Sequence, residues 1–312
     1  MKPTQAAVFS VVSNSTLVAL KLIAGFITGS VSIISEAIHS GLDLLAALIA
    51  LYSVNQSSRP PDEAHSYGHG KIENVSALAE ALLIFVAAAW IIVEAVRRLI
   101  LGVGVESLGL GLAIMAFSAV ANYLISVLLF RVGRKHDSLA LQADGLHLRT
   151  DVYTSLGVFV GLGVITATHL TVLDPIVAMV VAVLIIRASW NLTRESFRPL
   201  LDVRLPEEDE IAVRQVVENF RGEYVEFHKL RTRKAGPERH IDLHLVVHPD
   251  HQIAEVHDLA DRIEKAIRAL WPRTSVLIHM EPCNGRECAI CRDPCEAARS
   301  ARVEPAEAER DG

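Results

Sequence analysis

Cysteine is missing from the first 282 residues of this 312-residue chain. The cysteines that it has are Cys283, Cys288, Cys291 and Cys295. Their clustering excludes a disulfide framework and is typical of a metal-binding or redox segment. A thiolate cage for zinc or another soft metal fits the spacing, and spare thiols on a mobile tail fit it equally well. The fourth cysteine follows the third after only three residues, whereas in the plant-type iron–sulfur pattern it lies far downstream, so a cluster of that type is disfavoured.

Other absences exclude several classes of function. No GxxxxGK[ST] segment occurs, so nothing indicates nucleotide-powered pumping, and no HExxH segment indicates an intramembrane zinc protease. The net charge of -6 disfavours a nucleic-acid partner. The apolar run near the N-terminus has no small-residue cleavage site, which predicts a retained first span rather than a signal peptide.

The composition predicts a membrane half joined to a soluble half. Hydrophobic residues make up 51% of the chain, charged residues 21%, and the mean hydropathy is +0.34. Long apolar stretches are confined to residues 1–203, where a span needs about 20 largely apolar residues. We predict six transmembrane helices, at about 7–29, 31–54, 74–100, 107–130, 139–168 and 174–196.

Basic residues predict the orientation of these spans. An even number of spans puts both termini on one side, and most lysines and arginines of the short loops fall on that side. They are Lys2, Arg59, Lys71, Arg131, Arg134, Lys135, Arg194 and Arg198. Only Arg97 and Arg98 fall on the other side of the membrane. The positive-inside rule therefore places both termini and the loop 55–73 in the cytoplasm, in a multi-pass protein of the inner (cytoplasmic) cell membrane.

Residues 204–284 predict a small cytoplasmic α+β domain of order αββαβ. The expected helices are 207–220 and 253–271, and the expected strands are 225–235, 239–248 and 275–281. In the second strand Ile241, Leu243 and Leu245 share one face, whereas His240 and His244 share the other. One face of the sheet is therefore expected to be packed and the other polar. We expect residues 285–312 to form a disordered tail.

Two HxxxD pairs within the apolar stretches are the strongest functional signal. His39 and Asp43 lie four residues apart, as do His147 and Asp151, so each pair shares one face of a helix. Two such helices side by side would present a nitrogen and oxygen set that suits a tetrahedral divalent metal, zinc before others. Buried polar contacts between helices are the alternative, but ionisable residues in spans favour the metal site.

Histidines outside the spans indicate further candidate sites. Asp62, His65 and His69 form either a second, exposed metal site or an ordinary polar loop. The soluble half is rich in histidine, at positions 228, 240, 244, 248, 251, 257 and 279. Ligands on neighbouring strands could meet there, although a solvated strand face is the alternative, and for His248 and His251 we prefer it.

Four segments together resemble one family, the cation diffusion facilitators. They are GSVSIISEAIHSGLD at 29–43, HSYGHGKIE at 65–73, ADGLHLRTD at 143–151 and VLIHMEPC at 276–283. The resemblance runs from about residue 6 to residue 284. It implies a homodimer, each chain with six spans and a cytoplasmic metallochaperone-like domain for metal sensing and dimerisation. It also implies exchange of divalent metal for protons.

The resemblance also assigns roles to particular residues. It implies that His39, Asp43, His147 and Asp151 form the transport site and that Asp62, His65 and His69 form a second site. It implies a binuclear site at the dimer interface, made by His228, His244, His257, His279 and Glu281. A salt bridge between Lys71 and Asp202 would join the two halves. The bacterial zinc or iron branch often has Asp at position 39, and the His form is more similar to the zinc and cadmium branches.

We therefore predict a secondary active transporter, not an enzyme. Its substrate is a divalent transition metal, zinc first and cadmium, cobalt or iron as alternatives, with no organic cofactor. The partners are protons, the lipid bilayer and a second copy of the chain. The rival function is a membrane-anchored metal sensor or storage protein, although anchoring needs no HxxxD pairs. A membrane metallohydrolase would need an open coordination position, which four protein ligands do not leave.

Overall fold

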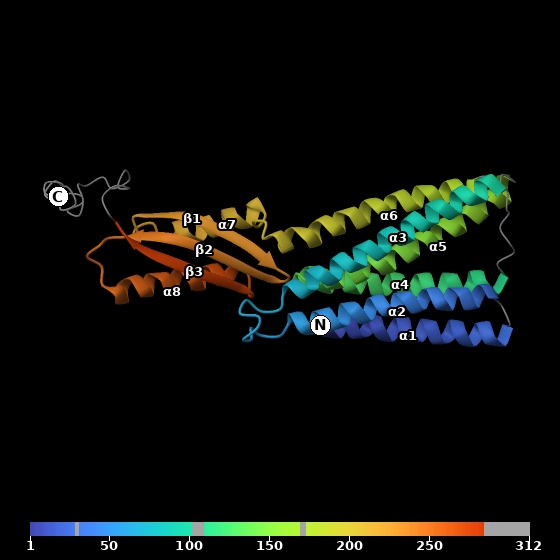
Figure 1. Cartoon of the computed structure of the whole chain (residues 1–312), viewed down its shortest axis with the longest axis horizontal. Coiled ribbons are helices and arrows are strands. Elements are labelled where there is room, and N and C mark those ends of the chain that lie inside the picture. Colours follow the sequence, from blue (N-terminus) through green and yellow to red (C-terminus); the bar gives the residue numbers. More distant parts are fainter. Residues whose placement is uncertain (29–30, 102–108, 169–172, 284–312) are drawn as a thin grey trace, which may run out of the picture. The chain divides into compact units, whose positions relative to one another are not determined.

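The computed structural model describes residues 1–28, 31–101, 109–168 and 173–283, and it divides into two compact units, Met1–Leu201 and Asp202–Gly312. The first unit is helical. Its helices are α1 (Pro3–Thr28), α2 (Val31–Ser57), α3 (Lys71–Leu101), α4 (Gly109–His136), α5 (Leu139–Thr168) and α6 (Leu173–Phe197), followed by the short 3₁₀ helix η1 (Arg198–Leu201). In the ribbon α1, α2 and α4 lie beside one another, and α3, α5 and α6 run together at an angle to them (Figure 1).

Most of these helices are long and apolar enough to cross a bilayer. At 1.5 Å per residue, 25 to 31 residues exceed the roughly 30 Å of the hydrocarbon layer. Within the described residues, α1, α2, α3, α4 and α6 qualify by length and composition. The first half of α5 carries Asp144, His147, Arg149 and Asp151, and α5 is not among the qualifying helices. The chain is therefore a multi-pass membrane protein, with five such helices in its described part.

Small residues let the helices approach closely. The side chains at the helix contacts include a set of fully buried alanines, among them Ala46, Ala47, Ala77, Ala81 and Ala143. Close packing of small residues is the usual way in which helices associate in lipid. Large apolar side chains such as Ile27 and Trp90 point outward and are mostly exposed. The bundle therefore presents an apolar exterior and keeps its polar groups inside.

A buried carboxylate joins three chain segments at one end of the bundle. Glu73, in the first turn of α3, accepts hydrogen bonds from the hydroxyl of Ser57 at 2.6 Å and that of Ser138 at 2.5 Å. All three side chains are almost fully buried. Ser138 directly precedes α5, and Asp137 before it adopts a positive φ of 58°, which asparagine and aspartate tolerate best after glycine. The network thereby links the end of α2 and the starts of α3 and α5.

The second unit is an α+β domain of the predicted order αββαβ. Its elements are α7 (Glu207–Glu218), β1 (Glu226–Ala235), β2 (Glu238–Val247), α8 (Ile253–Leu270) and β3 (Thr274–Pro282). The strand order is β1-β2-β3, with β1 antiparallel and β3 parallel to β2. Gly236, with a φ of 58°, permits the tight turn of the hairpin. The helix α8 supplies the crossover that a parallel pair requires.

The packed face of the sheet follows the predicted alternation. The core side chains come from alternate positions of β2 and from one face each of α7 and α8: Val213, Val217, Ile241, Leu243, Leu245, Leu259, Ile263 and Ile267. Val246 departs from the pattern, because it lies on the predicted polar face and yet is 1% exposed. The opposite face of the sheet carries His228, His244 and His279 at neighbouring positions.

Candidate functional site

The HxxxD pair of α2 lies on a helix face that contacts α5. The Asp43 side chain is 4% exposed, whereas that of His39 is 54% exposed. The two residues are one turn apart, so both side chains project toward the same neighbour although only one is deeply buried. A carboxylate buried within a membrane helix is costly unless a cation or a donor compensates it.

The pair of α5 completes the set by contacting α2 crosswise. The Nε2 atom of His147 lies 3.2 Å from an oxygen of Asp43, and the Nε2 atom of His39 lies 3.9 Å from an oxygen of Asp151. One ligand atom each from His39, Asp43 and Asp151 lies within 4.8 Å of the other two. The structure therefore brings together all four predicted residues, two imidazoles and two carboxylates. Such a donor set suits zinc and similar divalent metals.

Further charged residues surround this set. Glu80 on α3 and Asp144 on α5 are fully buried. Arg149, between the two members of the α5 pair in sequence, turns away and lies 4.2 Å above the ring of Phe130 on α4, as a cation–π contact. Lys21 on α1 is also buried, and it belongs to none of the sites predicted from the sequence. A lone lysine inside an apolar run is the signal that would have found it.

The loop between α2 and α3 brings Asp62, His65 and His69 together. One oxygen of Asp62 lies 3.1 Å from Nδ1 of His65, and the other lies 3.2 Å from Nε2 of His69. The two imidazole rings are 4.4 Å apart, and the ligand atoms fall within 4.8 Å of one another. The backbone N–H of His65 donates to Asp62 and lowers the pKa of its carboxyl group. The carboxylate is thus held ionised, as a metal ligand must be.

A row of three histidines crosses the sheet of the second unit. His228, His244 and His279 occupy paired positions on β1, β2 and β3. The ring centroids of His228 and His244 are 5.5 Å apart, and those of His244 and His279 are 4.7 Å apart. A register shift follows His228 in β1, and Lys229 there has a positive φ of 53°. This irregularity is a β-bulge, a feature that often redirects side chains next to functional sites.

Glu281 lies at the centre of this row. Its carboxylate accepts from Nδ1 of His244 at 2.6 Å and lies 3.2 Å from Nε2 of His228. Nε2 of His279 is 3.8 Å away. The hydrogen bond from His244 lowers the pKa of Glu281, with smaller contributions from Lys229 and His228. Four of the five residues that the resemblance implied are therefore adjacent in one chain.

His257 is the fifth residue and lies elsewhere. It is exposed on α8, whose buried face packs against the apolar side of the sheet. The row of histidines occupies the other side, so His257 does not join that cluster within one chain. His248 and His251 lie around the turn after β2, with ring centroids 6.1 Å apart, as expected for a solvated turn.

Lys71 and Asp202 belong to different units, so their salt bridge stays a prediction. Within its own unit, Asp202 lies 3.3 Å from Nη1 of Arg233. Cys283 is buried, and its backbone N–H donates to the carbonyl of Val247. The other three cysteines lie outside the described residues.

Both units match models of known families. Residues 7–201 match the cation efflux transmembrane domain, and residues 205–283 match the cytoplasmic domain of cation efflux proteins. A transporter of Synechocystis sp. named sll1263, described as uncharacterised, is 35% identical over 276 residues, which cover 88% of this chain and 89% of the relative. The cation-efflux pump FieF of Citrobacter koseri is 31% identical over 282 residues, 90% of this chain and 93% of that pump.

A solved chain of CzrB, described as a candidate zinc transporter, is 38% identical to this chain. It covers 25% of this chain and 98% of its own length, with a TM-score of 0.25. The two family models together account for nearly all residues from 7 to 283, and FieF is similar over almost its whole length. The chain therefore belongs to the cation efflux family, the cation diffusion facilitators.

Proposed function

We propose that this protein exports zinc from the cytoplasm in exchange for protons. Membership of the cation efflux family makes it a metal transporter rather than an enzyme. The observation that carries the choice of site is the crosswise contact of α2 with α5, in which His147 meets Asp43 and His39 meets Asp151. Two imidazoles and two carboxylates favour zinc, cadmium, cobalt or iron over manganese and magnesium.

The ligand types supply the coupling to protons. Metal binds to neutral imidazole and to ionised carboxylate, so binding of the metal releases protons and binding of protons releases the metal. Imidazole ordinarily titrates near neutral pH, within reach of a cellular proton gradient. When open to the cytoplasm, the site takes up metal and loses protons. When it is open to the other side, protons displace the metal, and rocking of the helices provides alternating access.

This mechanism requires α5 to span the membrane with the other five helices. The polar first half of α5 then faces the bundle interior, where Asp144 and His147 are buried. We propose an inner-membrane protein with both termini cytoplasmic, a membrane domain at 1–203 and a soluble domain at 204–284. The basic residues of the short loops support this orientation.

The other two clusters are proposed as regulatory metal sites. Asp62, His65 and His69 would bind a metal on the cytoplasmic loop. His228, His244, His279 and Glu281 would bind metal in the soluble domain of a homodimer. His257, which lies apart from them within one chain, would contribute only across the dimer interface. Metal that binds better to the assembled dimer stabilises it and biases the transport equilibrium, by reciprocal linkage.

Flux through sealed vesicles tests the proposal. We expect purified protein to move zinc with an opposite movement of protons, recorded together with internal zinc and pH indicators. Asp151→Ala removes one carboxylate of the transport site and should abolish both movements. Asp261→Ala, which removes an exposed carboxylate on α8, serves as the control and should retain them. Zinc bound but not moved by the wild type would favour a sensor, and flux of another metal alone would correct the substrate.

A further inference from the structure

Lys21 is a buried cation that the transport mechanism does not use. It lies within the apolar length of α1 and is 5% exposed. Among the described residues it is the only lysine or arginine that is fully buried. An ionisable side chain in a membrane helix is costly, and such residues pair with other groups and mark functional positions. The side chain therefore has a role that outweighs this cost.

Its hydrogen bond places the ammonium group beside the transport site. Nζ of Lys21 donates to the hydroxyl of Ser40 on α2 at 2.7 Å, and Ser40 is 4% exposed. Ser40 precedes Asp43 by three residues, so the two side chains share one buried face of α2, with Cβ atoms about 5–6 Å apart. Asp43 in turn contacts His147. The ammonium group thus lies on the helix face that carries the buried carboxylate of the site.

The buried charges of the bundle need such a cation. Four carboxylic side chains are almost fully buried in the described part of the helical unit: Asp43, Glu73, Glu80 and Asp144. Carboxylates that share a low-dielectric interior destabilise one another, and a nearby positive charge relieves this. Of these four, Asp43 is the one that shares a buried face of α2 with Ser40, the acceptor of the Lys21 hydrogen bond.

We propose that Lys21 is a fixed counter-cation of the transport site and a determinant of its metal affinity. The inference rests on the proposed transport site at His39, Asp43, His147 and Asp151. Lys21 stabilises the ionised carboxylates while no metal is bound. Once a divalent ion enters, the ammonium group repels it and weakens its binding. Release of the metal on the far side is thereby faster, and the site does not become a trap.

A purely structural role is the competing explanation, and substitutions of Lys21 and of Ser40 distinguish it from the counter-cation role. Lys21→Gln keeps a donor for Ser40 but removes the charge. Lys21→Arg keeps both. Ser40→Ala removes the acceptor and leaves the charge. A structural role predicts that loss of the hydrogen bond matters, whereas a counter-cation predicts that only loss of the charge matters.

The test is zinc binding by the full-length protein in detergent, measured at pH 8. Transport-site binding is the part of the titration that Asp151→Ala removes. We expect Lys21→Gln to bind zinc about tenfold more tightly than the wild type at pH 8, and to turn over more slowly in vesicles. Lys21→Arg should stay within about threefold of the wild type.

Distinct outcomes would overturn the inference. Equal affinities for the Gln and Arg variants at pH 8 would refute it, as would a matching change in Ser40→Ala. If Lys21→Gln does not fold while Lys21→Arg and Ser40→Ala do, the affinity in Ser40→Ala decides: a shift in that variant refutes the charge role, and wild-type affinity supports it. If Asp151→Ala leaves zinc binding intact, the proposed site itself is wrong, and the Lys21 proposal is refuted with it.

Discussion

Side-chain partners at the proposed transport site lie on different helices. Sequence spacing joins His39 to Asp43 and His147 to Asp151, but in the structure each histidine lies against the aspartate of the other helix. The histidine and the aspartate of each pair lie one turn apart on their own helix, so the two side chains do not compete for the same position. The set is therefore sensitive to any shift of α2 along α5, which is the kind of motion that could open or close a metal site.

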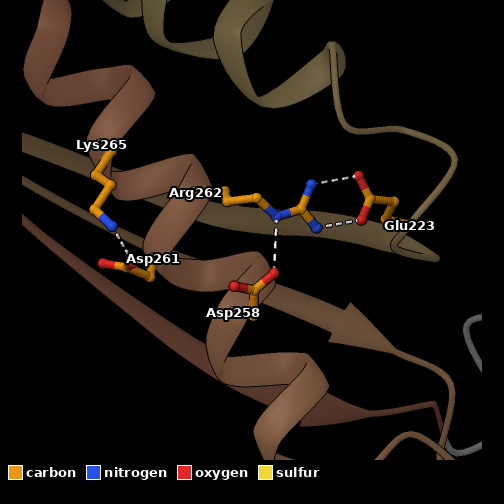
Figure 2. Close-up of polar contacts among 5 residues, drawn as sticks. All are labelled: Glu223, Asp258, Asp261, Arg262 and Lys265. Atoms are coloured by element: carbon orange, nitrogen blue, oxygen red, sulfur yellow. Dashed lines mark hydrogen bonds and ion pairs between the residues drawn. The ribbon is translucent and has the colours of Figure 1, made fainter.

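At the residue scale, an ion cluster on the soluble unit leads to a prediction about pH. Arg262 on α8 contacts both oxygens of Glu223 and, at 3.1 Å, an oxygen of Asp258 (Figure 2). Glu223 lies between α7 and β1, so this cluster joins two segments, whereas Lys265 and Asp261 pair within α8 (Figure 2). The guanidinium group lowers the pKa of Glu223.

We expect Arg262→Gln to loosen residues 219–226 at neutral pH and to have no effect in acid. A depressed carboxyl pKa stabilises the folded state above the unfolded pKa of about 4.5, and this is lost as pH falls through the folded value. Hydrogen exchange of this segment should therefore be faster in the variant than in the wild type at pH 7, and this difference should shrink as the pH falls below 4.5. Arg268→Gln, which breaks a pair within α8, is the control and should leave the segment unchanged.

At the element scale, the Glu73 network decides how the ends of three helices are held. Its carboxylate accepts hydrogen bonds from Ser57, the last residue of α2, and from Ser138, which directly precedes α5. The same helix α3 begins at Lys71, two residues after His69 of the candidate loop site. The network therefore connects the loop cluster to the helix that carries His147 and Asp151.

Glu73→Ala should destabilise the membrane unit by roughly 2–4 kcal/mol, because two buried hydroxyls lose their acceptor. Glu73→Gln retains one acceptor oxygen and should cost less. Thermal unfolding of the full chain in detergent measures both. A wild-type melting temperature in both variants would show that the hydroxyls find other acceptors and that the network does not hold the helix ends.

At the scale of the whole molecule, the candidate metal sites are spread over two units. The four-residue set is in the helical unit, and the row of histidines with Glu281 is in the soluble unit. If the first set transports and the second regulates, removal of a ligand from each should have different consequences for flux.

His279→Ala should leave the maximal rate of zinc transport within about twofold of wild type and move its half-saturation to higher zinc. The side chain lies beside Glu281 in the soluble unit, so its loss weakens metal binding there without touching the transport ligands. Zinc-dependent flux in vesicles measures both parameters. A complete loss of transport, equal to that expected for Asp151→Ala, would contradict a regulatory role of the histidine row.

Much of the soluble unit was predictable from the sequence, because its elements follow local rules. The alternation in β2 and the Gly236-Pro237 turn predicted strands that end within one residue of the observed bounds. The helix α7 ends at Glu218, two residues earlier than predicted. Within the described residues, five of the predicted spans correspond to helices long and apolar enough to cross a membrane, and the span predicted at 139–168 corresponds to α5, which is outside that set.

The sequence alone determined which residue types stand at which spacing, and hence the ligand sets and the family. Only the tertiary structure decided which ligands meet: His39 with Asp151, Asp43 with His147, and Glu281 with His228 and His244, while His257 lies apart. It also decided that Lys21 is buried beside Ser40. Spacing along a chain specifies a helix face or a strand face, but contacts between elements depend on packing and register, which local patterns do not encode.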